Sequence, residues 1–361
     1  MYFPYLHGKQ KEVLALRHLA PLLGAEGRVQ PVIEPVRQAA TSVRHTLEAC
    51  EAHRLQTWLV VNPARQDFEL LPQMQTLEWG RQLFTSLPRR QWIHPTLLLG
   101  PTLTPEVVRR FVQLFSGRPL GVVVGCDGPP LAEVLALLAG APLRLVFFKN
   151  VEPRPLSVFP AGLSSALGAP GASGVAGVSA VWVEDRPAPD NQALRLHERH
   201  LFSEQPLRYE AQGRAGFSDF ATLPSRPDAP DVSSRLVSFR LTYLRCAATT
   251  GPGRSEVWIE HFIGDRPPGE DGHAQARFRG ALQAFHLALD RPDTCFGPTE
   301  AARRYLTSFI DGVLPSRALS KQWEVMHHLE LMSGMLAGRF PSPPERADVP
   351  RSLLETDVRA R

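Results

Sequence analysis

Short apolar runs that end in a polar residue or glycine recur along the chain and constrain its fold more than any other feature. A segment with helical spacing of apolar residues follows each run. The stretches that contain these runs are Pro31–Val36, Leu59–Pro63, Thr96–Gly100, Gly121–Asp127, Leu145–Lys149 and Val181–Asp185. Continuous apolar runs of this length are typical of parallel strands that are buried on both faces. The pattern predicts an α/β fold with a parallel sheet.

Eight strand–helix units can be counted, which is the number that closes a (β/α)8 barrel of the TIM type. The alternative is an open doubly wound sheet, in which a glycine-rich phosphate loop often follows the first strand. The segment from Pro4 to Lys9 has one glycine only, which favours the barrel. The strands are centred on Phe3, Ile33, Val60, Leu98, Val123, Phe147, Trp182 and a position after Phe217.

The regular alternation weakens before residue 200 and then fails. The Gly/Ala-rich stretch Ala161–Ala180 predicts a poorly ordered helix with a flexible loop, and a helix is expected over Asp190–His200. Two apolar runs, Leu236–Leu244 and Val257–Ile263, predict a β-hairpin inserted in an irregular region of residues 201–265.

Three helical segments follow and predict a C-terminal helical cap over residues 270–338. They lie near Ala274–Leu289, Thr299–Ile310 and Leu319–Leu336. We therefore expect one barrel-like domain over residues 1–340. The remaining residues, 341–361, are rich in proline and charge, which predicts a disordered tail.

Composition gives limited information about partners. The formal net charge is +4 and the pI about 9.0, with almost all of the positive charge carried by arginine. This excess is too small to argue nucleic-acid binding by itself. The four cysteines form no CxxC pair, and no apolar run approaches the length of a membrane span. The sequence predicts a cytoplasmic protein without a membrane segment.

Polar residues follow the carboxyl ends of most predicted strands. In a closed parallel barrel these ends converge on one mouth, where active sites are built. Carboxylates, an amide and an amine together suit proton transfer, Schiff-base chemistry or cation binding. The alternative is that strand ends carry polar residues because they meet water. The residues expected at the mouth are Glu34, Asn62, Asp127, Lys149, Glu184 and Asp185.

Four of the acidic and basic residues are candidates for catalysis. Lys149 follows four apolar residues, so burial is expected to lower its pKa. Glu184 and Asp185 are adjacent on a strand, so only one of them can face the mouth. Asp219 lies between two phenylalanines and is either a metal-binding or base carboxylate or an Asx-turn residue. The candidates are Glu34, Lys149, Asp185 and Asp219.

Two histidines have helical or strand neighbours that favour a packing role. The alternation of side chains along a strand puts His261 on the same face as Val257 and Ile259, as expected of a core or edge histidine. His328 borders the apolar face of the last helix with Glu324 four residues before it, whereas His327 points nearly opposite. The two cannot ligate one metal from this helix. Both His261 and His328 are kept as candidates for ligand binding, together with Lys9, Gln10, Asn62, Asp127 and Glu184.

Common motifs of well-known enzyme classes are absent from the sequence. It has no Walker phosphate loop, GxGxxG, GxSxG elbow or zinc-finger spacing, which disfavours a common NTPase, dehydrogenase or hydrolase. The sequence indicates no cofactor and no particular metal.

Five stretches spread from the N-terminus to the last helix are Tyr2–Gln10, Pro31–Val36, Val61–Pro63, Gly216–Phe220 and Ser320–Glu330. Together they resemble the beta protein family of bacteria and phages. The resemblance implies a bacterial cytosolic protein of mobile elements or phage conflict, and it transfers no reaction. The resemblance also supports the residues that match its motifs as candidates for a site, without giving them a role: Lys9, Gln10, Glu34, Asn62, Asp219 and His328.

These observations lead to one main expectation and two alternatives. The first is a phage-defence or genetic-conflict protein with a polar pocket at the barrel mouth, acting on a phosphate- or nucleotide-like ligand. The second is a non-catalytic scaffold subunit that binds a partner protein, such as a nuclease from the same locus. The third is direct binding of nucleic acid through arginine, which predicts steep salt dependence. The sequence does not decide whether the protein is an enzyme.

Overall fold

The structure is a computed structural model that describes residues 1–125, 128–149, 178–185, 199–223, 238–245, 254–264 and 274–340. Asp127, residues 161–177 of the Gly/Ala-rich stretch, residues 190–198 of the expected helix and the expected tail lie outside the described residues.

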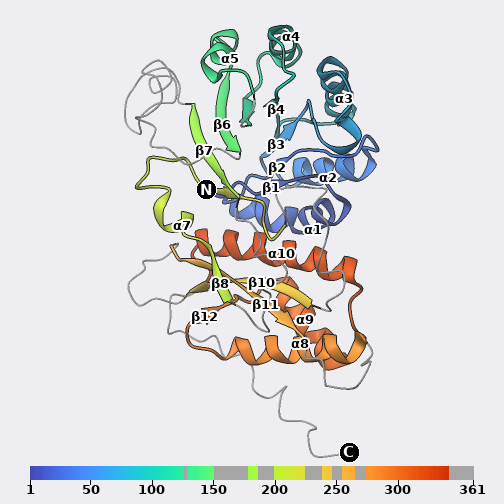
Figure 1. Cartoon of the computed structure of the whole chain (residues 1–361), viewed down its shortest axis with the longest axis vertical. Helices are drawn as coiled ribbons and strands as arrows, with labels where there is room; N and C mark the ends of the chain where they lie inside the picture. Colours follow the sequence, from blue (N-terminus) through green and yellow to red (C-terminus); the bar gives the residue numbers. More distant parts are fainter. Residues whose placement is uncertain are drawn as a thin grey trace, which may run out of the picture.

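An eight-stranded parallel sheet forms the upper half of the molecule in Figure 1. Tyr2 makes parallel bridges to both Val29 and Phe217, and the Phe3 N–H donates to the Phe217 carbonyl at 2.9 Å. These contacts join the two edges of the sheet, and the predicted TIM-type barrel is confirmed. The strands, in their order around the barrel, are β1 (Tyr5–Leu6), β2 (Val32–Ile33), β3 (Thr57–Val60), β4 (Ile93–Leu99), β5 (Leu120–Val124), β6 (Leu143–Lys149), β7 (Ser179–Glu184) and β9 (Ser218–Asp219).

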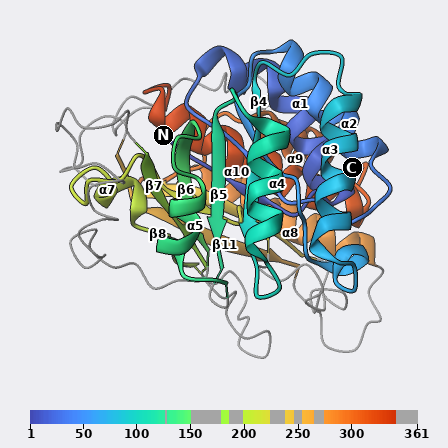
Figure 2. The ribbon, with the colours of Figure 1, turned by 90° about the horizontal axis from the view of Figure 1, so that it is seen from above.

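Helices pack against the outside of these strands (Figures 1 and 2). The start of helix α4 is fixed by its sequence: the Thr104 hydroxyl accepts the Val107 N–H and Pro105 occupies the first helical position. The elements of this layer are α1 (Gln10–Glu26), α2 (Thr41–Ala52), the 3₁₀ turn η1 (Gln66–Phe68), α3 (Gln73–Ser86), α4 (Pro105–Phe115) and α5 (Leu131–Leu137).

Two apolar layers follow from the alternation of side chains along each strand. One set, with Leu59 and Val122, packs between strands and helices. The other set fills the barrel interior, and its members include Phe3, Tyr5, Val32, Trp58, Val60, Val123, Phe147 and Phe220. The side chains that point into the barrel are therefore followed, at the carboxyl ends of the strands, by side chains that face the mouth.

A second, antiparallel sheet lies below the barrel in Figure 1. Its order is β12 (Thr294–Cys295), β10 (Ser238–Arg245), β11 (Val257–Ile263) and β8 (Arg199–Ser203). The predicted hairpin is confirmed as β10 and β11. The helix expected to reach His200 is wrong at its end, because Arg199 and His200 pair with Glu260 and Ile259 of β11 as strand residues. A short helix, α7 (Gln205–Arg208), follows β8.

The three expected C-terminal helices are present as α8 (Ala274–Leu289), α9 (Glu300–Asp311) and α10 (Arg317–Leu336). Helix α10 contacts α1 of the barrel on one side and β10 and α9 on the other (Figure 1). Every residue from Trp323 to Met335 is buried. The helix is therefore covered on all sides, beyond the one apolar face that its spacing indicates. Among the described residues, no helix is both long and apolar enough to cross a membrane.

Candidate functional site

Glu34 and Lys149 form a buried ion pair at the carboxyl ends of β2 and β6. The Lys149 Nζ lies 2.5 Å from Glu34 Oε2, and the Tyr5 hydroxyl donates to the same oxygen at 2.6 Å. Lys149 Nζ also lies 3.3 Å from the Tyr5 hydroxyl oxygen and 4.3 Å from the centre of its ring. The side chain of Glu34 is fully buried and that of Lys149 is 4 % exposed. Three barrel strands thus bring an amine, a carboxylate and a phenol together.

The protonation states of this triad follow from burial and charge. Burial raises the pKa of Glu34, but the charges of Lys149 and His7 and the hydrogen bonds from Lys149 and Tyr5 outweigh it and lower the pKa to about 2. Burial lowers the pKa of Lys149, as the sequence predicts, and the Glu34 charge opposes that shift. Burial, with the charge of Glu34, raises the pKa of Tyr5 well above its usual value. The pair is a carboxylate and an ammonium group beside a neutral phenol.

Further side chains surround the triad on the mouth side. Arg65 Nε lies 3.7 Å from Glu34 Oε1 and is 30 % exposed. The ring of His7 stacks on Phe220 with 5.6 Å between centroids, and Phe220 lies 5.9 Å from Lys149 Nζ. The exposed Asp185 is close enough for its charge to raise the Lys149 pKa. The mouth therefore carries charges of both signs around one buried pair.

The loop between β1 and α1 contributes a buried acid that the sequence reasoning missed. Lys9 is the N-cap of α1, and Gln10 is its first, exposed residue. Glu12 is the third helical residue, and its carboxyl receives backbone hydrogen bonds from His7, Gly8 and Lys9. Burial raises its pKa to about 7, against the effect of the Lys9 charge and these bonds. The missed signal is the carboxylate at the third helical position, which reaches back to the backbone N–H groups before the helix.

Asn62 is held by the protein on both sides of its amide. Its Nδ2 donates to Gln73 Oε1 at 2.9 Å and to the Leu98 carbonyl at 2.8 Å, and its Oδ1 accepts the Leu98 N–H at 2.7 Å. The side chain thereby extends the pairing of β3 with β4 by one step. These contacts give Asn62 a structural role beneath the mouth.

Glu184 and Asp185 point to opposite sides of β7, as their adjacency predicts. Glu184 accepts a hydrogen bond from the Ser203 hydroxyl of β8 at 2.6 Å, outside the barrel. Asp185 lies on the side of Lys149. Of the two acids, Asp185 is the one that belongs to the mouth.

Asp219 and His328 lie together outside the barrel wall and away from the Glu34–Lys149 pair. Asp219 Oδ1 accepts the Tyr2 hydroxyl at 2.6 Å and the Ala221 N–H at 2.7 Å, so the Asx-turn interpretation is the one the contacts support. His328 Nε2 is 3.0 Å from the Tyr2 hydroxyl oxygen, and its Nδ1 is 3.0 Å from Thr242 Oγ1. These contacts suit a packing role for His328.

The expected neighbours of the two helix histidines are partly wrong. Glu324 does not orient His328; it lies near Arg240 and Lys321, at 3.8 and 3.7 Å. His327 does not point away from the neighbours of His328: its Nε2 is 2.7 Å from the Thr242 carbonyl oxygen and its Nδ1 is 2.8 Å from Thr299 Oγ1, and Thr242 also contacts His328. Contacts on every side of α10 cannot be read from the helical spacing of one segment.

His261 faces α10 from the antiparallel sheet. Its ring lies 5.8 Å from that of His200, and it is 4 % exposed. Burial, followed by the positive charges of Arg240, His200 and Lys321, lowers its pKa to about 3. His261 is therefore a neutral side chain in positive surroundings.

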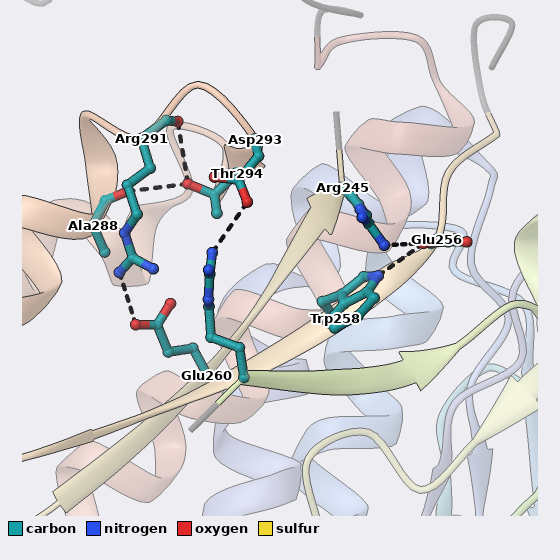
Figure 3. Close-up of polar contacts among 9 residues, drawn as sticks. Arg245, Glu256, Trp258, Glu260, Ala288, Arg291, Asp293 and Thr294 are labelled. Atoms are coloured by element: carbon teal, nitrogen blue, oxygen red, sulfur yellow. Dashed lines mark hydrogen bonds and ion pairs between the residues drawn. The ribbon is translucent and has the colours of Figure 1, made fainter. Parts of the chain in front are cut away.

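The opposite face of the same sheet carries arginines that are each paired with an acid (Figure 3). Arg291 donates to Glu260 at 2.7 Å, and Arg199 donates to Asp293 at 3.1 Å. Arg245 donates to Glu256, which also accepts from the Trp258 indole. These contacts form a charge network that is balanced within the protein.

The fold and the contacts at its mouth define an α/β-barrel protein with a buried lysine–carboxylate pair. Within the described ranges, no three histidine, cysteine, aspartate or glutamate side chains converge as a metal site. No model of a protein family, no curated protein and no solved structure matches the chain. The resemblance to the beta protein family stays a prediction from its motifs.

Proposed function

We propose that this chain is a cytoplasmic bacterial protein of phage defence or genetic conflict that binds a small phosphate- or nucleotide-like ligand at the barrel mouth and acts on it. The observation that carries the ligand site is the buried contact of Lys149 with Glu34 and Tyr5. The motif resemblance supports the defence setting. The position of the triad supports the site, because enzymes of this fold react at the carboxyl ends of the strands.

The stability that such a pair provides does not explain its presence. Removing two charges from water costs several kcal/mol per ion by general experience, and replacing a buried pair by apolar residues is often neutral or stabilising. An ion pair with side-chain exposures of 0 and 4 % in an otherwise apolar barrel interior is therefore better explained by chemistry than by folding.

Lysine usage points in the same direction. The chain has only four lysines among 40 basic residues, and two of them, Lys9 and Lys149, lie after or at the carboxyl end of a barrel strand. Arginine stays charged in proteins, whereas a buried lysine can release its proton. Because the chain uses arginine for nearly all of its other positive charges, the lysine at position 149 supports the interpretation that an amine is required there.

The geometry assigns roles to the chain's own side chains. Arg65 is partly exposed beside Glu34 and would attract the anionic group of a ligand entering the mouth. Lys149 would donate a proton to the bound ligand and regain one from water, and the Glu34 carboxylate would hold the lysine in place by accepting its hydrogen bond. Tyr5 fixes the Glu34 oxygen that faces the amine.

A thermal-shift screen against nucleotides and sugar phosphates tests this proposal, because a ligand of the folded state raises the melting temperature. We expect a shift in the wild type that is clearly smaller in Arg65→Gln and in the double variant Glu34→Gln/Lys149→Met. Arg44→Gln, which changes a half-exposed arginine on α2, is the matched control and should keep the shift. Equal shifts in all these proteins would refute a ligand site at the mouth.

A scaffold function is the second candidate, and exposed apolar residues favour it. Leu287 of α8, Ile310 of α9 and Val313 are 62, 69 and 69 % exposed, and the stacking of His286 on Phe309 brings the two helices together there. Exposed apolar groups of this kind mark protein interfaces. Co-purification with the products of neighbouring genes tests this candidate. Ile310→Lys should abolish a complex formed through this surface, whereas Arg65→Gln should leave it intact.

A further inference from the structure

A second polar cluster lies between α10 and the face of the antiparallel sheet that is turned toward the barrel. We call Thr222, Arg240, His261, Lys321 and Glu324 the α10 cluster. Arg240 comes from β10, His261 from β11, Lys321 and Glu324 from α10, and Thr222 from the segment after β9. Figure 1 shows α10 between the barrel and this sheet. The cluster is thus built from four separate parts of the chain.

The cluster holds more hydrogen-bond donors than acceptors. Arg240 donates to the Thr222 carbonyl at 3.0 Å, which uses one of the five N–H donors of a guanidinium. Arg240 Nε and Lys321 Nζ lie 3.8 and 3.7 Å from Glu324 Oε2, beyond hydrogen-bond distance. The Arg240 and Lys321 side chains are 18 and 22 % exposed, so donors not used within the protein are accessible to a ligand rich in acceptor oxygens.

Two buried oxygen atoms of the cluster also lack a hydrogen bond within the part of the chain that is described. They are Thr222 Oγ1 and Glu324 Oε2, in side chains of residues that are 3 and 2 % exposed. Such atoms are rare in folded proteins, and each calls for an explanation. A ligand that accepts from the cations and donates to Glu324 would satisfy both kinds of group.

The charge of the cluster favours an anion. Arg240 and Lys321 carry two positive charges and Glu324 one negative charge, while His261 is held neutral by burial and by its cationic neighbours. The arginines on the opposite face of the sheet, in Figure 3, are by contrast each bonded to an acid. The excess of cationic donors is therefore a property of the face toward the barrel.

We infer that the α10 cluster binds the phosphate group of a hydroxylated phosphate ester, such as a sugar phosphate or a nucleotide. Arg240 and Lys321 hold the phosphate oxygens, as guanidinium and ammonium groups commonly do. Glu324 accepts a hydrogen bond from a ligand hydroxyl, since a carboxylate would repel a second anionic group. A ligand without a hydroxyl would leave the Glu324 oxygen without a donor.

The cluster adjoins the barrel mouth through one short segment. Thr222 follows Phe220 by two residues, and Phe220 lies 5.9 Å from Lys149 Nζ. This proximity leads us to extend the inference to one ligand whose phosphate binds the α10 cluster and whose reacting end lies beside Lys149. This last step rests on the proposed function, whereas phosphate binding by the cluster does not.

Calorimetric titration with inorganic phosphate, ribose 5-phosphate and ribose tests the inference on the full chain. We expect Lys321→Gln and Arg240→Gln each to weaken the affinity for both phosphates at least tenfold. Arg245→Gln is the matched control, because Arg245 lies on the same strand but opposite face and pairs with Glu256. Glu324→Gln should weaken ribose 5-phosphate more than inorganic phosphate, and ribose alone should bind weakly to every protein.

Further variants separate this site from the barrel mouth. The double variant Glu34→Gln/Lys149→Met should keep the affinity for inorganic phosphate if the α10 cluster holds it. The inference is overturned if that double variant loses phosphate while Lys321→Gln keeps it, or if the wild type binds no phosphate. Arg240→Gln also removes a bond to Thr222, so if it fails to fold, the more exposed Lys321→Gln decides.

Discussion

The imidazole of His328 joins the last long helix to the second residue of the chain, with Nε2 lying 3.0 Å from the Tyr2 hydroxyl oxygen. The same hydroxyl donates to Asp219, and the other ring nitrogen of His328 contacts the Thr242 hydroxyl. One buried ring thereby connects the segment before β1, and through it the last barrel strand β9, with the antiparallel sheet. We conclude that the hydrogen bonds of His328 link the two sheets of the molecule.

The first prediction concerns the stability that this ring provides. His328→Ala should lower the free energy of unfolding by about 2–4 kcal/mol, because it leaves a cavity and removes a hydrogen-bond partner from Tyr2 and Thr242. Urea denaturation measures the loss. His45→Ala, at an exposed position on α2, is the control and should change stability by less than about 0.5 kcal/mol. Equal losses in the two variants would contradict the role of His328.

The alternation of apolar strands and helices was sufficient to predict the barrel and to place Glu34 and Lys149 at one mouth. Both residues directly end strand patterns, and the closure of the barrel brings strand ends together whatever their separation in sequence. The contact of His328 with Tyr2 could not be predicted in this way. It joins residues from two elements whose relative placement depends on the packing of α10, which no local spacing records.

Other parts of the site were missed for a similar reason. Arg65 lies in a loop, where no periodicity fixes the direction of a side chain. Arg240 and Lys321 meet Glu324 only because α10 packs on one face of the antiparallel sheet. Local patterns therefore predict which residues end a strand, and tertiary packing decides which side chains surround them.

The second prediction concerns the pH dependence of the Glu34–Lys149 pair. The pKa of Glu34 in the folded state, about 2, lies below its usual 4.5, so the pair's stabilisation is present above about pH 4.5 and lost as the pH falls toward 2. The shift corresponds to about 3 kcal/mol. Glu34→Gln should show no such loss in this range. At pH 7 it should be less stable than the wild type by about 3–5 kcal/mol, because Lys149 stays buried without its partner.

A double variant provides the control for this prediction. Glu34→Gln/Lys149→Met removes both charges, and it should recover most of the stability lost in Glu34→Gln alone. Denaturation curves measured at several pH values decide the outcome. If Glu34→Gln keeps the full stability of the wild type at pH 7, the two side chains do not form a buried ion pair in solution.

The third prediction tests the packing that supports Asn62. Gly80 of α3 lies against the strand end that precedes Asn62, and a Cβ atom at this glycine would lie 1.9 Å from the Val61 carbonyl oxygen. Since backbone cannot move aside easily, Gly80→Ala should cost at least about 3 kcal/mol in unfolding free energy. Gly100→Ala, where a Cβ meets nothing within 4 Å, should be tolerated. Similar melting temperatures for both variants would exclude this close approach of α3 to β3.

The fourth prediction concerns Glu12, whose pKa is shifted in the opposite direction from that of Glu34, so that its effect on stability changes with pH in the opposite sense. Its pKa of about 7 in the folded state exceeds the usual 4.5, so the folded protein binds more protons than the unfolded chain between these values. Stability is then greatest below about pH 4.5 and falls as the pH rises to about 7, by about 3 kcal/mol from this group. Glu12→Gln, which cannot ionise, should lack this fall.

Comparison of Glu12→Gln with the wild type at pH 5 and pH 8 gives the test. The variant should gain stability relative to the wild type at the higher pH, since the wild type must either ionise a buried acid or keep it protonated at a cost. Glu69→Gln, at an exposed position, should show the same relative stability at both values. A Glu12→Gln variant that loses equal stability at both pH values would show instead that the carboxyl acts only as a helix cap, holding the loop of His7 and Gly8 in place.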